Sequence, residues 1–121
     1  MKISNLTLWV QENGISTKFY QKLGFEIVHT DDDHSIVALG GFEIILVSMR
    51  ADEEFAGDAL AGDKGKGVYI YISVDNADAA YMKLVQNGIQ PHTEPRNWQW
   101  GTREFIVKDP DGYKLCFSAP Q

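Results

Sequence analysis

Apolar residues recur with two different periods in the first 48 residues of the chain. From Ile3 to Val10 they alternate with polar residues, which is typical of a strand with one buried face. From Asn13 to Leu23 they follow a helical period, and Gly24 stands where a left-handed C-cap would end the helix. Three strand-like runs follow, at 25–30, 35–39 and 42–48. This part of the chain is therefore predicted to fold as β-α-β-β-β.

The same order of periods begins again at Val68. The run from Val68 to Val74 alternates, Asn76 is a suitable helix N-cap, and a helical stripe of apolar residues then extends to Gly88. Near the C-terminus, two apolar-rich runs flank Asp109-Pro110-Asp111-Gly112, whose residue types are those that a type I turn favours. This pattern predicts a closing hairpin. The second part of the chain repeats the organisation of the first, with an offset of 64 residues between matching core positions such as Val10 and Val74.

Two such repeats predict an α+β fold in which two β-α-β-β-β modules form a cupped mixed sheet. We expect a single domain over 1–121, with the first module at 1–48, a connecting loop at 49–67 and the second module at 68–121. Each helix would cover one face of its sheet. The opposite faces would then line a concave surface, where we expect a ligand to bind.

Composition and charge narrow the classes of partner. The chain has 121 residues, a net charge of −6 and a pI near 4.9, which argues against nucleic acid and favours cationic small molecules. The run Asp31-Asp32-Asp33 concentrates that charge. Cys116 is the single cysteine, and the chain has neither an apolar leader nor a run of eighteen apolar residues. We therefore expect a cytoplasmic protein that is not bound to a membrane.

Three stretches of sequence carry a family resemblance. They read FYQKLGF at 19–25, VDNADAA at 74–80 and DPDG at 109–112. Together they span most of the chain and resemble the vicinal oxygen chelate superfamily, the group of glyoxalase I, extradiol dioxygenases and bleomycin-resistance proteins. The resemblance implies the fold of two β-α-β-β-β modules, but a fold alone does not define a reaction.

In metal-using members, the resemblance implies, each module supplies two metal ligands, one from its first strand and one from its last. In this chain those positions fall at Asn5, Ile45, Tyr69 and Cys116. A catalytic divalent metal requires about three protein ligands with imidazole, carboxylate or thiolate groups, and only Cys116 offers one. We therefore expect no metal, no other cofactor and no catalytic residue. These expectations favour a binding protein over an enzyme.

One enzyme alternative remains open, although the histidines give it no support. The histidines His29, His34 and His92 show none of the spacings of known metal motifs, so we expect each to be a surface or hydrogen-bonded residue. The alternative is a divergent metal-dependent lyase, isomerase or dioxygenase of the same superfamily. Its metal would be held at shifted positions, for example by Glu43 or Glu104 with a histidine.

In place of metal ligands, the predicted concave face offers aromatic side chains. The stretch Trp100-Gly101 followed by Glu104-Phe105 is similar to that of bleomycin-resistance proteins. Those members are acidic, lack the metal, and sequester a planar cationic antibiotic between two subunits. The resemblance thus implies a homodimer with a role in antibiotic resistance that binds a planar or cationic small molecule without a metal. The residues expected to contact the ligand are Asn5, Thr7, Trp9, Tyr69, Tyr71, Trp98, Trp100, Glu104 and Cys116.

Two features leave the identity of the partner open. Arg103 could pair with a carboxylate or a phosphate, which would favour an anionic ligand over a cationic one. The aromatic face could also dock another protein, or only pack within the fold.

Overall fold

The computed structural model describes residues 1–49 and 64–121. They fall into two compact units, unit 1 (residues 1–63) and unit 2 (residues 64–121), each with its own sheet and helix. Most of the predicted connecting loop at 49–67 lies outside the described residues, so its bounds and those of the modules stay a prediction. In the described ranges, no helix has the length and apolar character needed to span a membrane.

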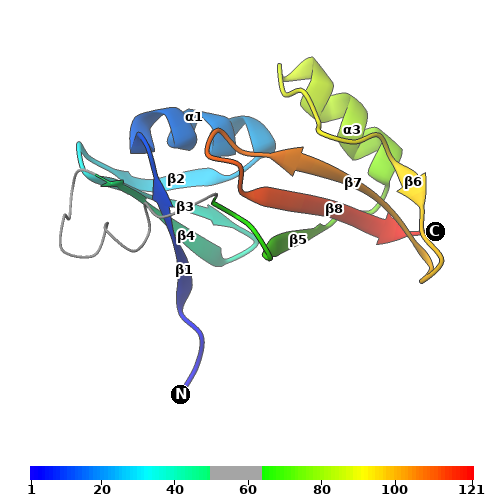
Figure 1. The fold of residues 1–121 in the computed structure, drawn as a ribbon, viewed down its shortest axis with the longest axis horizontal. Coiled ribbons are helices and arrows are strands. Elements are labelled where there is room, and N and C mark those ends of the chain that lie inside the picture. The colour runs from blue at the N-terminus through cyan, green and yellow to red at the C-terminus, as the bar shows by residue number, and fades with distance from the viewer. Residues whose placement is uncertain (50–63) are drawn as a thin grey trace. The chain divides into compact units, whose positions relative to one another are not determined.

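In its described residues, unit 1 contains a four-stranded mixed sheet and one helix (Figure 1). The strand order is β1-β4-β3-β2, with β1 parallel to β4 and the other neighbours antiparallel. The elements are β1 (Asn5–Val10), α1 (Asn13–Leu23), β2 (Glu26–Thr30), β3 (His34–Leu39) and β4 (Phe42–Ser48).

Unit 2 repeats this topology. Its strand order is β5-β8-β7-β6, with β5 parallel to β8 and the other neighbours antiparallel. The elements are β5 (Tyr69–Ser73), α3 (Ala77–Gln86), β6 (Arg96–Asn97), β7 (Thr102–Lys108) and β8 (Lys114–Pro120). The predicted α+β fold of two β-α-β-β-β modules is thereby confirmed. The two-residue strand β6 was not predicted, because two polar residues show no alternation.

The predicted end of α1 and start of α3 are confirmed, and both have a local cause, whereas α3 ends at Gln86, before the predicted Gly88. Gly24 adopts a φ of 110°, a conformation that residues with a side chain rarely adopt. Its N–H donates to the carbonyl of Gln21 at 3.0 Å, which ends the helix. The side chain of Asn76 accepts a hydrogen bond from the Ala79 N–H at 2.9 Å, so it satisfies one of the free donors at the start of α3.

The core of unit 1 lies between α1 and one face of its sheet. Tyr20 of α1 is fully buried, and its ring meets that of Phe25 edge to face at a centroid distance of 5.2 Å. Strands β1, β3 and β4 contribute alternate residues, which are buried together because successive side chains of a strand point to opposite faces. They are Leu8, Val10, Val37, Ile44 and Leu46.

The core of unit 2 is more aromatic. Phe105 of β7 and Phe117 of β8 are stacked at a centroid distance of 4.9 Å, and Tyr81 of α3 meets Phe105 edge to face at 5.4 Å. Phe105 and Phe117 are only 1% and 4% exposed. Buried aromatic pairs of this kind add about 0.5–1.5 kcal/mol beyond the burial of their area. The stack therefore attaches α3 to the centre of the β7–β8 hairpin.

The predicted turn between β7 and β8 is also confirmed. The Gly112 N–H donates to the Asp109 carbonyl at 3.0 Å, which closes a β-turn. The buried carboxylate of Asp109 accepts hydrogen bonds from the N–H groups of Asp111 and Tyr113, both at 2.9 Å. The hairpin register is therefore set by side-chain chemistry within the turn.

Candidate ligand-binding site

A cavity of about 380 Å³ opens in unit 2 on the sheet face opposite α3. Its volume lies within the range of small-molecule sites, about 300–1,000 Å³. Every lining residue belongs to unit 2, and most come from β5, β7, β8 and the segment before β7. They are Tyr69, Tyr71, Thr93, Arg96, Trp98, Trp100, Glu104, Ile106 and Cys116.

Strand alternation and register explain why the tyrosines reach this cavity. On β5, Ile70 and Ile72 share the face of the buried core, so Tyr69 and Tyr71 point the other way. In the sheet register, Tyr71 pairs with Cys116, and Cys116 pairs with Ile106. These three side chains form one row across the cavity floor. The predicted face of Tyr69 and Tyr71 agrees with this arrangement.

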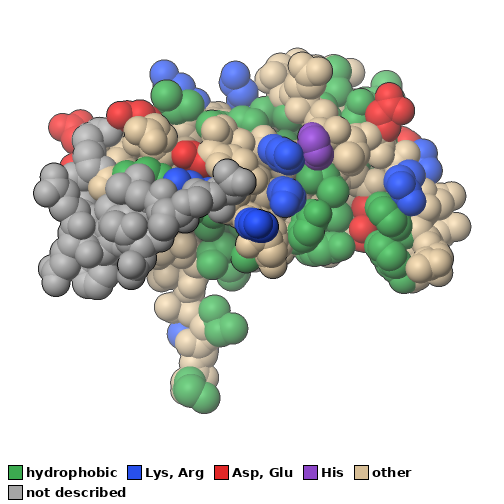
Figure 2. Space-filling view, in the orientation of Figure 1, with side chains coloured by type: hydrophobic (Ala, Val, Ile, Leu, Met, Phe, Trp, Pro, Cys, Tyr) green, Lys and Arg blue, Asp and Glu red, His purple; other side chains and the backbone are tan. Residues whose placement is uncertain are grey.

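The two tryptophans are held by a tight turn between β6 and β7. Their rings are stacked with a centroid distance of 4.6 Å and an interplanar angle of 12°. The Gly101 N–H donates to the Trp98 carbonyl at 3.1 Å, and the Trp98 N–H donates to the Thr102 carbonyl at 2.8 Å. Gly101 has a φ of 95°, a conformation that side-chain-bearing residues rarely adopt. Figure 2 shows hydrophobic side chains gathered in two groups over unit 2, with acidic atoms between them.

Two basic side chains contact the aromatic walls. The guanidinium carbon of Arg96 lies 3.7 Å from the ring centroid of Trp98, and the Lys114 ammonium lies 5.3 Å from that of Tyr69. Both distances fit cation–π contacts. At 3.7 Å and 4.6 Å, Arg96 and Trp100 cannot share one face of the Trp98 ring. The outer face of Trp100, whose side chain is 56% exposed, is therefore left open.

Glu104 is a buried carboxylate in the cavity wall, with 5% of its surface exposed. Its Oε2 accepts hydrogen bonds from Thr102 Oγ1 at 2.8 Å and Ser118 Oγ at 2.9 Å. Its Oε1 lies at longer distances from the hydroxyl of Tyr71 (3.5 Å) and the thiol of Cys116 (3.6 Å).

The hydrogen bonds keep Glu104 ionised. Burial alone raises the pKa of this carboxyl, but donors on Thr102, Ser118, Trp100 and Cys116 outweigh burial and hold its pKa below the ordinary value. In the described part of the chain, no Lys, Arg or His forms an ion pair with Glu104. The cavity therefore contains a desolvated negative charge that hydrogen bonds stabilise and no cation neutralises.

The neighbouring thiol and phenol stay protonated at neutral pH. Burial, assisted by the charge of Glu104, raises the pKa of the Cys116 thiol to about 11. Desolvation of its hydroxyl and the contacts with Cys116 and Glu104 raise the pKa of Tyr71 to about 12. Neither group is therefore a ready nucleophile.

The positions where the resemblance implies metal ligands do not fit a metal. In unit 1, Asn5 and Ile45 lie on the sheet face opposite α1 and offer an amide and an alkyl group. In unit 2, Tyr69 offers a phenol, and Cys116 is a buried thiol with a raised pKa. The lining of the unit 2 cavity, as far as the structure describes it, contains Glu104 but no histidine. A shifted site that combines Glu104 with a histidine finds no support in this lining.

Three predicted ligand-contact residues lie in the other unit. Asn5, Thr7 and Trp9 occupy alternate positions of β1 and share a face with Ile45 and Val47 of β4, opposite α1. Their part in ligand binding stays a prediction. The structure brings together the other six predicted residues, which are Tyr69, Tyr71, Trp98, Trp100, Glu104 and Cys116.

The basic residue at the cavity differs from the one that the sequence suggested. Arg103 does not line the cavity, because its guanidinium donates to both carboxylate oxygens of Asp78, each at 3.0 Å, and to Asn97. Arg96 stands at the cavity instead, and Thr93 and Ile106 were also not expected there. Thr93 and Arg96 lie in a segment without periodicity, so the sequence carried no signal for them. Ile106 could have been found from alternation along β7.

Comparisons with known proteins agree with the fold. The model of the Glyoxalase/Bleomycin resistance protein/Dioxygenase superfamily matches residues 2–117. No curated protein sequence matches the chain.

Among solved structures, a glyoxalase/bleomycin resistance protein/dioxygenase from Nocardioides has a TM-score of 0.84 and 24% identity, over 99% of this chain and 83% of that one. A bleomycin-binding protein complexed with bleomycin has a TM-score of 0.69 and 22% identity, over the whole of both chains. A lactoylglutathione lyase from Agrobacterium tumefaciens has a TM-score of 0.72 and 14% identity, over 98% and 92% of the two chains. At such identities these likenesses show a common fold, which serves both a binding protein and an enzyme.

Proposed function

This chain belongs to the glyoxalase/bleomycin resistance protein/dioxygenase superfamily, and from that premise we propose that its unit 2 cavity binds a planar or cationic small molecule without a metal ion. The observation that carries the proposal is the ionised Glu104, buried among the rings of Tyr69, Tyr71, Trp98 and Trp100.

The electrostatics of the cavity favour a positively charged ligand. A negative charge removed from water attracts a cation more strongly than an exposed one, because the surrounding medium screens it less. The aromatic faces add cation–π attraction, about 0.5–2 kcal/mol for each contact. Arg96 and Lys114 lie over the rings of Trp98 and Tyr69, and these contacts support the proposal that rings of the cavity attract cations.

The shape of the cavity favours a flat ligand. Trp98 and Trp100 present a stack with one open face, and a planar ring can extend that stack as a further layer. The ligand that fits both features has an aromatic plane and a positively charged or hydrogen-bond-donating group that reaches Glu104. The fold neighbour that holds bleomycin supports an antibiotic-like molecule as the first compound to test.

The test is a calorimetric titration with bleomycin and with pairs of planar compounds that differ only in one positive charge. We expect the cationic member of each pair to bind more tightly. Glu104→Gln should weaken the cationic member at least ten-fold and the neutral member much less. Glu26→Gln, which removes an exposed acid from the edge strand β2 of unit 1, is the matched control and should change neither. Equal affinity for charged and neutral members would contradict the proposal.

Trp100→Leu tests stacking through the neutral member of each pair. It removes the exposed aromatic ring and also one of the donors that hold the pKa of Glu104 low, while the hydrogen bonds from Thr102 and Ser118 remain. We expect the binding of both members to weaken, and the loss for the neutral member measures stacking alone.

We further propose that the protein acts as a cytoplasmic homodimer and contributes to antibiotic resistance. The support is the sequence similarity to bleomycin-resistance proteins. Light scattering of the purified protein with and without bleomycin measures the assembly, and expression in a sensitive bacterium measures protection. A monomer under both conditions, or unchanged sensitivity, would refute the respective part.

A further inference from the structure

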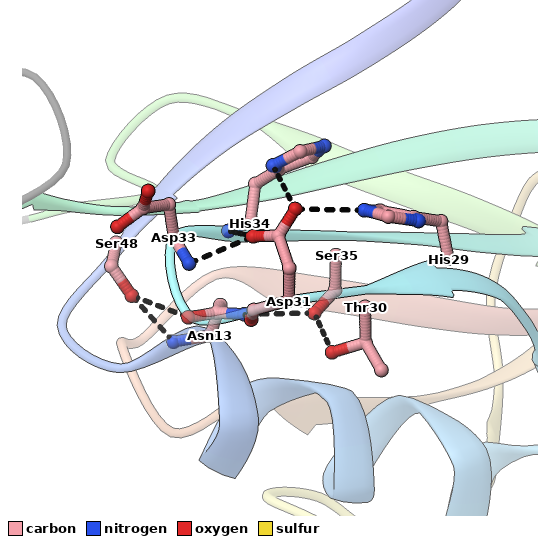
Figure 3. A network of polar contacts seen from close by, with 8 residues as sticks. All are labelled: Asn13, His29, Thr30, Asp31, Asp33, His34, Ser35 and Ser48. Carbon is pink, nitrogen blue, oxygen red and sulfur yellow. Dashed lines mark hydrogen bonds and ion pairs between the residues drawn. The ribbon is translucent and has the colours of Figure 1, made fainter.

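Three metal-ligating side chains of unit 1 converge at the β2–β3 hairpin, which we name the hairpin cluster: His29, Asp31 and His34 (Figure 3). His29 Nε2 lies 2.8 Å and His34 Nδ1 lies 3.3 Å from the same oxygen, Asp31 Oδ2. The three ligand atoms all lie within 4.8 Å of one another. We propose that the hairpin cluster binds one divalent transition-metal ion, of the Zn²⁺ class, through two imidazole nitrogens and one carboxylate oxygen.

A β-bulge places both imidazoles on one face of the sheet. The register of β2 and β3 shifts between Ile27 and His29, so that His29 pairs with Ile36. Without the shift, His29 would pair with Ser35, whose side chain is buried on the α1 side. Ile36 lies on the opposite face, as does His34. The extra residue therefore turns His29 toward His34, and their ring centroids are 4.9 Å apart.

The turn presents one carboxylate oxygen to the two rings. Asp31 Oδ1 accepts hydrogen bonds from the N–H groups of Asp33 at 2.8 Å and His34 at 3.0 Å. These bonds fix the carboxylate plane and leave Oδ2 directed at both imidazoles. The hydrogen bond from His29, together with those two backbone donors, holds the pKa of Asp31 well below its ordinary value, so its carboxylate is ionised.

A buried polar network supports the turn from below (Figure 3). The Asn13 side chain donates to the Asp31 carbonyl and to Ser35 Oγ, both at 2.9 Å. Ser48 Oγ donates to Asn13 Oδ1 at 2.7 Å, and Asn13 is 2% exposed. Outer contacts of this kind orient metal ligands and contribute to affinity. The cluster is thus anchored to the core of unit 1 through the backbone of Asp31.

The donor set and its spacing suit a borderline transition metal. Two imidazoles and a carboxylate favour Zn²⁺, Ni²⁺ or Cu²⁺ over Mg²⁺ or Ca²⁺, which prefer oxygen ligands. Tetrahedral Zn²⁺ with bonds of about 2.0–2.1 Å separates its ligand atoms by about 3.3 Å. His34 Nδ1 and Asp31 Oδ2 already have that separation. The distance between His29 Nε2 and Asp31 Oδ2 needs to increase by about 0.5 Å. Between 38% and 47% of each side chain is exposed, which leaves room for water as further ligands.

Hydrogen bonding alone is the competing explanation, since an imidazole that donates to Asp31 would stabilise the hairpin without a metal. The two explanations differ in what Zn²⁺ does to the protein. The cluster shares no residue with the unit 2 cavity, so the proposal does not depend on the proposed ligand-binding function.

The experiment is a calorimetric titration of the chelator-treated full chain with Zn²⁺ at neutral pH. We expect one ion per chain with a micromolar dissociation constant. His29→Gln, His34→Gln and Asp31→Asn should each weaken binding at least ten-fold. Asp31→Asn retains an oxygen that can accept the turn hydrogen bonds, so it tests the ligand with little change to the hairpin. His92→Gln removes the one histidine outside the cluster and should leave binding unchanged.

Nitrogen-15 spectra of the histidine rings provide a second readout that does not depend on affinity. On addition of Zn²⁺ we expect Nε2 of His29 and Nδ1 of His34 to shift, and His92 to stay unchanged. Absence of binding at millimolar Zn²⁺ would overturn the proposal. So would binding that survives in His29→Gln and His34→Gln, or ring shifts confined to His92.

Discussion

The two units have the same topology but differ in the strand that follows the helix. In unit 1 this strand is β2, five residues long, and it leads through a tight turn that carries the hairpin cluster. In unit 2 it is β6, two residues long, and the segment after it carries the stacked Trp98 and Trp100. The other three strands are equivalent in order and direction. Three strands and the helix therefore form the constant frame, and the strand after the helix, with the turn that follows it, is where the two units differ most.

The units also differ in how the frame is stabilised. Unit 1 contains a buried polar network of Asn13, Ser35 and Ser48 beneath its turn. Unit 2 has the stacked Phe105 and Phe117 in its core. A buried polar network loses stability when one member is removed, because its partners lose hydrogen bonds. An aromatic core loses stability according to the volume that a substitution removes. Substitutions in the two units are therefore expected to lower stability by different amounts.

The largest effect is expected from Phe105→Ala in unit 2. The substitution removes a ring that is 1% exposed and contacts both Phe117 and Tyr81, so we expect a loss of about 3–5 kcal/mol in the free energy of unfolding. Urea unfolding followed by tryptophan fluorescence measures it. Phe42→Ala, at a site 45% exposed in unit 1, is the control and should cost much less.

The same variant shows whether the units unfold together. In a Trp9→Phe background, fluorescence reports only on Trp98 and Trp100 of unit 2, whereas a double Trp98→Phe, Trp100→Phe background reports on unit 1. If Phe105→Ala lowers the midpoint seen by Trp9 as much as the one seen by the other two, the units unfold cooperatively. A shift confined to Trp98 and Trp100 would show that each frame is stable by itself.

A smaller effect is expected from Asn13→Ala in unit 1. It removes the buried acceptor of the Ser48 hydroxyl and one of the two partners of Ser35 Oγ, which keeps its contact with Thr30. A lost buried partner of this kind costs about 1–3 kcal/mol. Chemical unfolding measures the loss. Asn13→Ala should also weaken Zn²⁺ binding at the hairpin cluster, because Asn13 anchors the Asp31 carbonyl. Unchanged stability would mean that water replaces the amide, and the contrast between a polar and an aromatic frame would fail.

Asn76→Ala tests the equivalent helix start in unit 2. Asn76 caps α3 through one exposed hydrogen bond to the Ala79 N–H, and loss of such a cap costs about 1 kcal/mol. Thermal unfolding measures it, and Asn76→Asp should retain most of the stability because aspartate caps equally well. A cost as large as that of Asn13→Ala would contradict the difference in burial between the two helix starts.

The constant frame could be predicted from the sequence because local chemistry defines it. Gly24 and Asn76 mark helix ends, and Asp109 organises its own turn, so each signal lies within a few residues of the structure it causes. Alternation along β5 likewise predicted the face of Tyr69 and Tyr71.

The strand after the helix was predicted in unit 1, as the run at 25–30, but the groups around this strand in the two units could not be, because their meeting depends on tertiary pairing. The spacing of His29, Asp31 and His34 fits no helical metal motif, and the three meet only because a bulge shifts the register of β2. Arg96 reaches Trp98 from a two-residue strand that no periodicity reveals. The hairpin cluster and the Arg96–Trp98 contact both involve the strand after the helix, which differs between the two units.

The smallest effect, and the one most specific to unit 2, is a dependence of stability on pH through Glu104. Its pKa in the folded protein is depressed, so the unfolded chain binds the proton more readily. Stability from this group is therefore fully present above the unfolded carboxyl value, about 4.3, and is lost as the pH falls through the lower folded value. Urea unfolding from neutral pH down to acid should show a shallower decline for Glu104→Gln than for the wild type. Because Asp31 and Asp78 also have depressed pKa values and remain in both proteins, only the difference between the two curves reports on Glu104. Parallel curves would show that its hydrogen bonds from Thr102 and Ser118 do not favour the charged form, and the argument for a cationic ligand would lose its electrostatic basis.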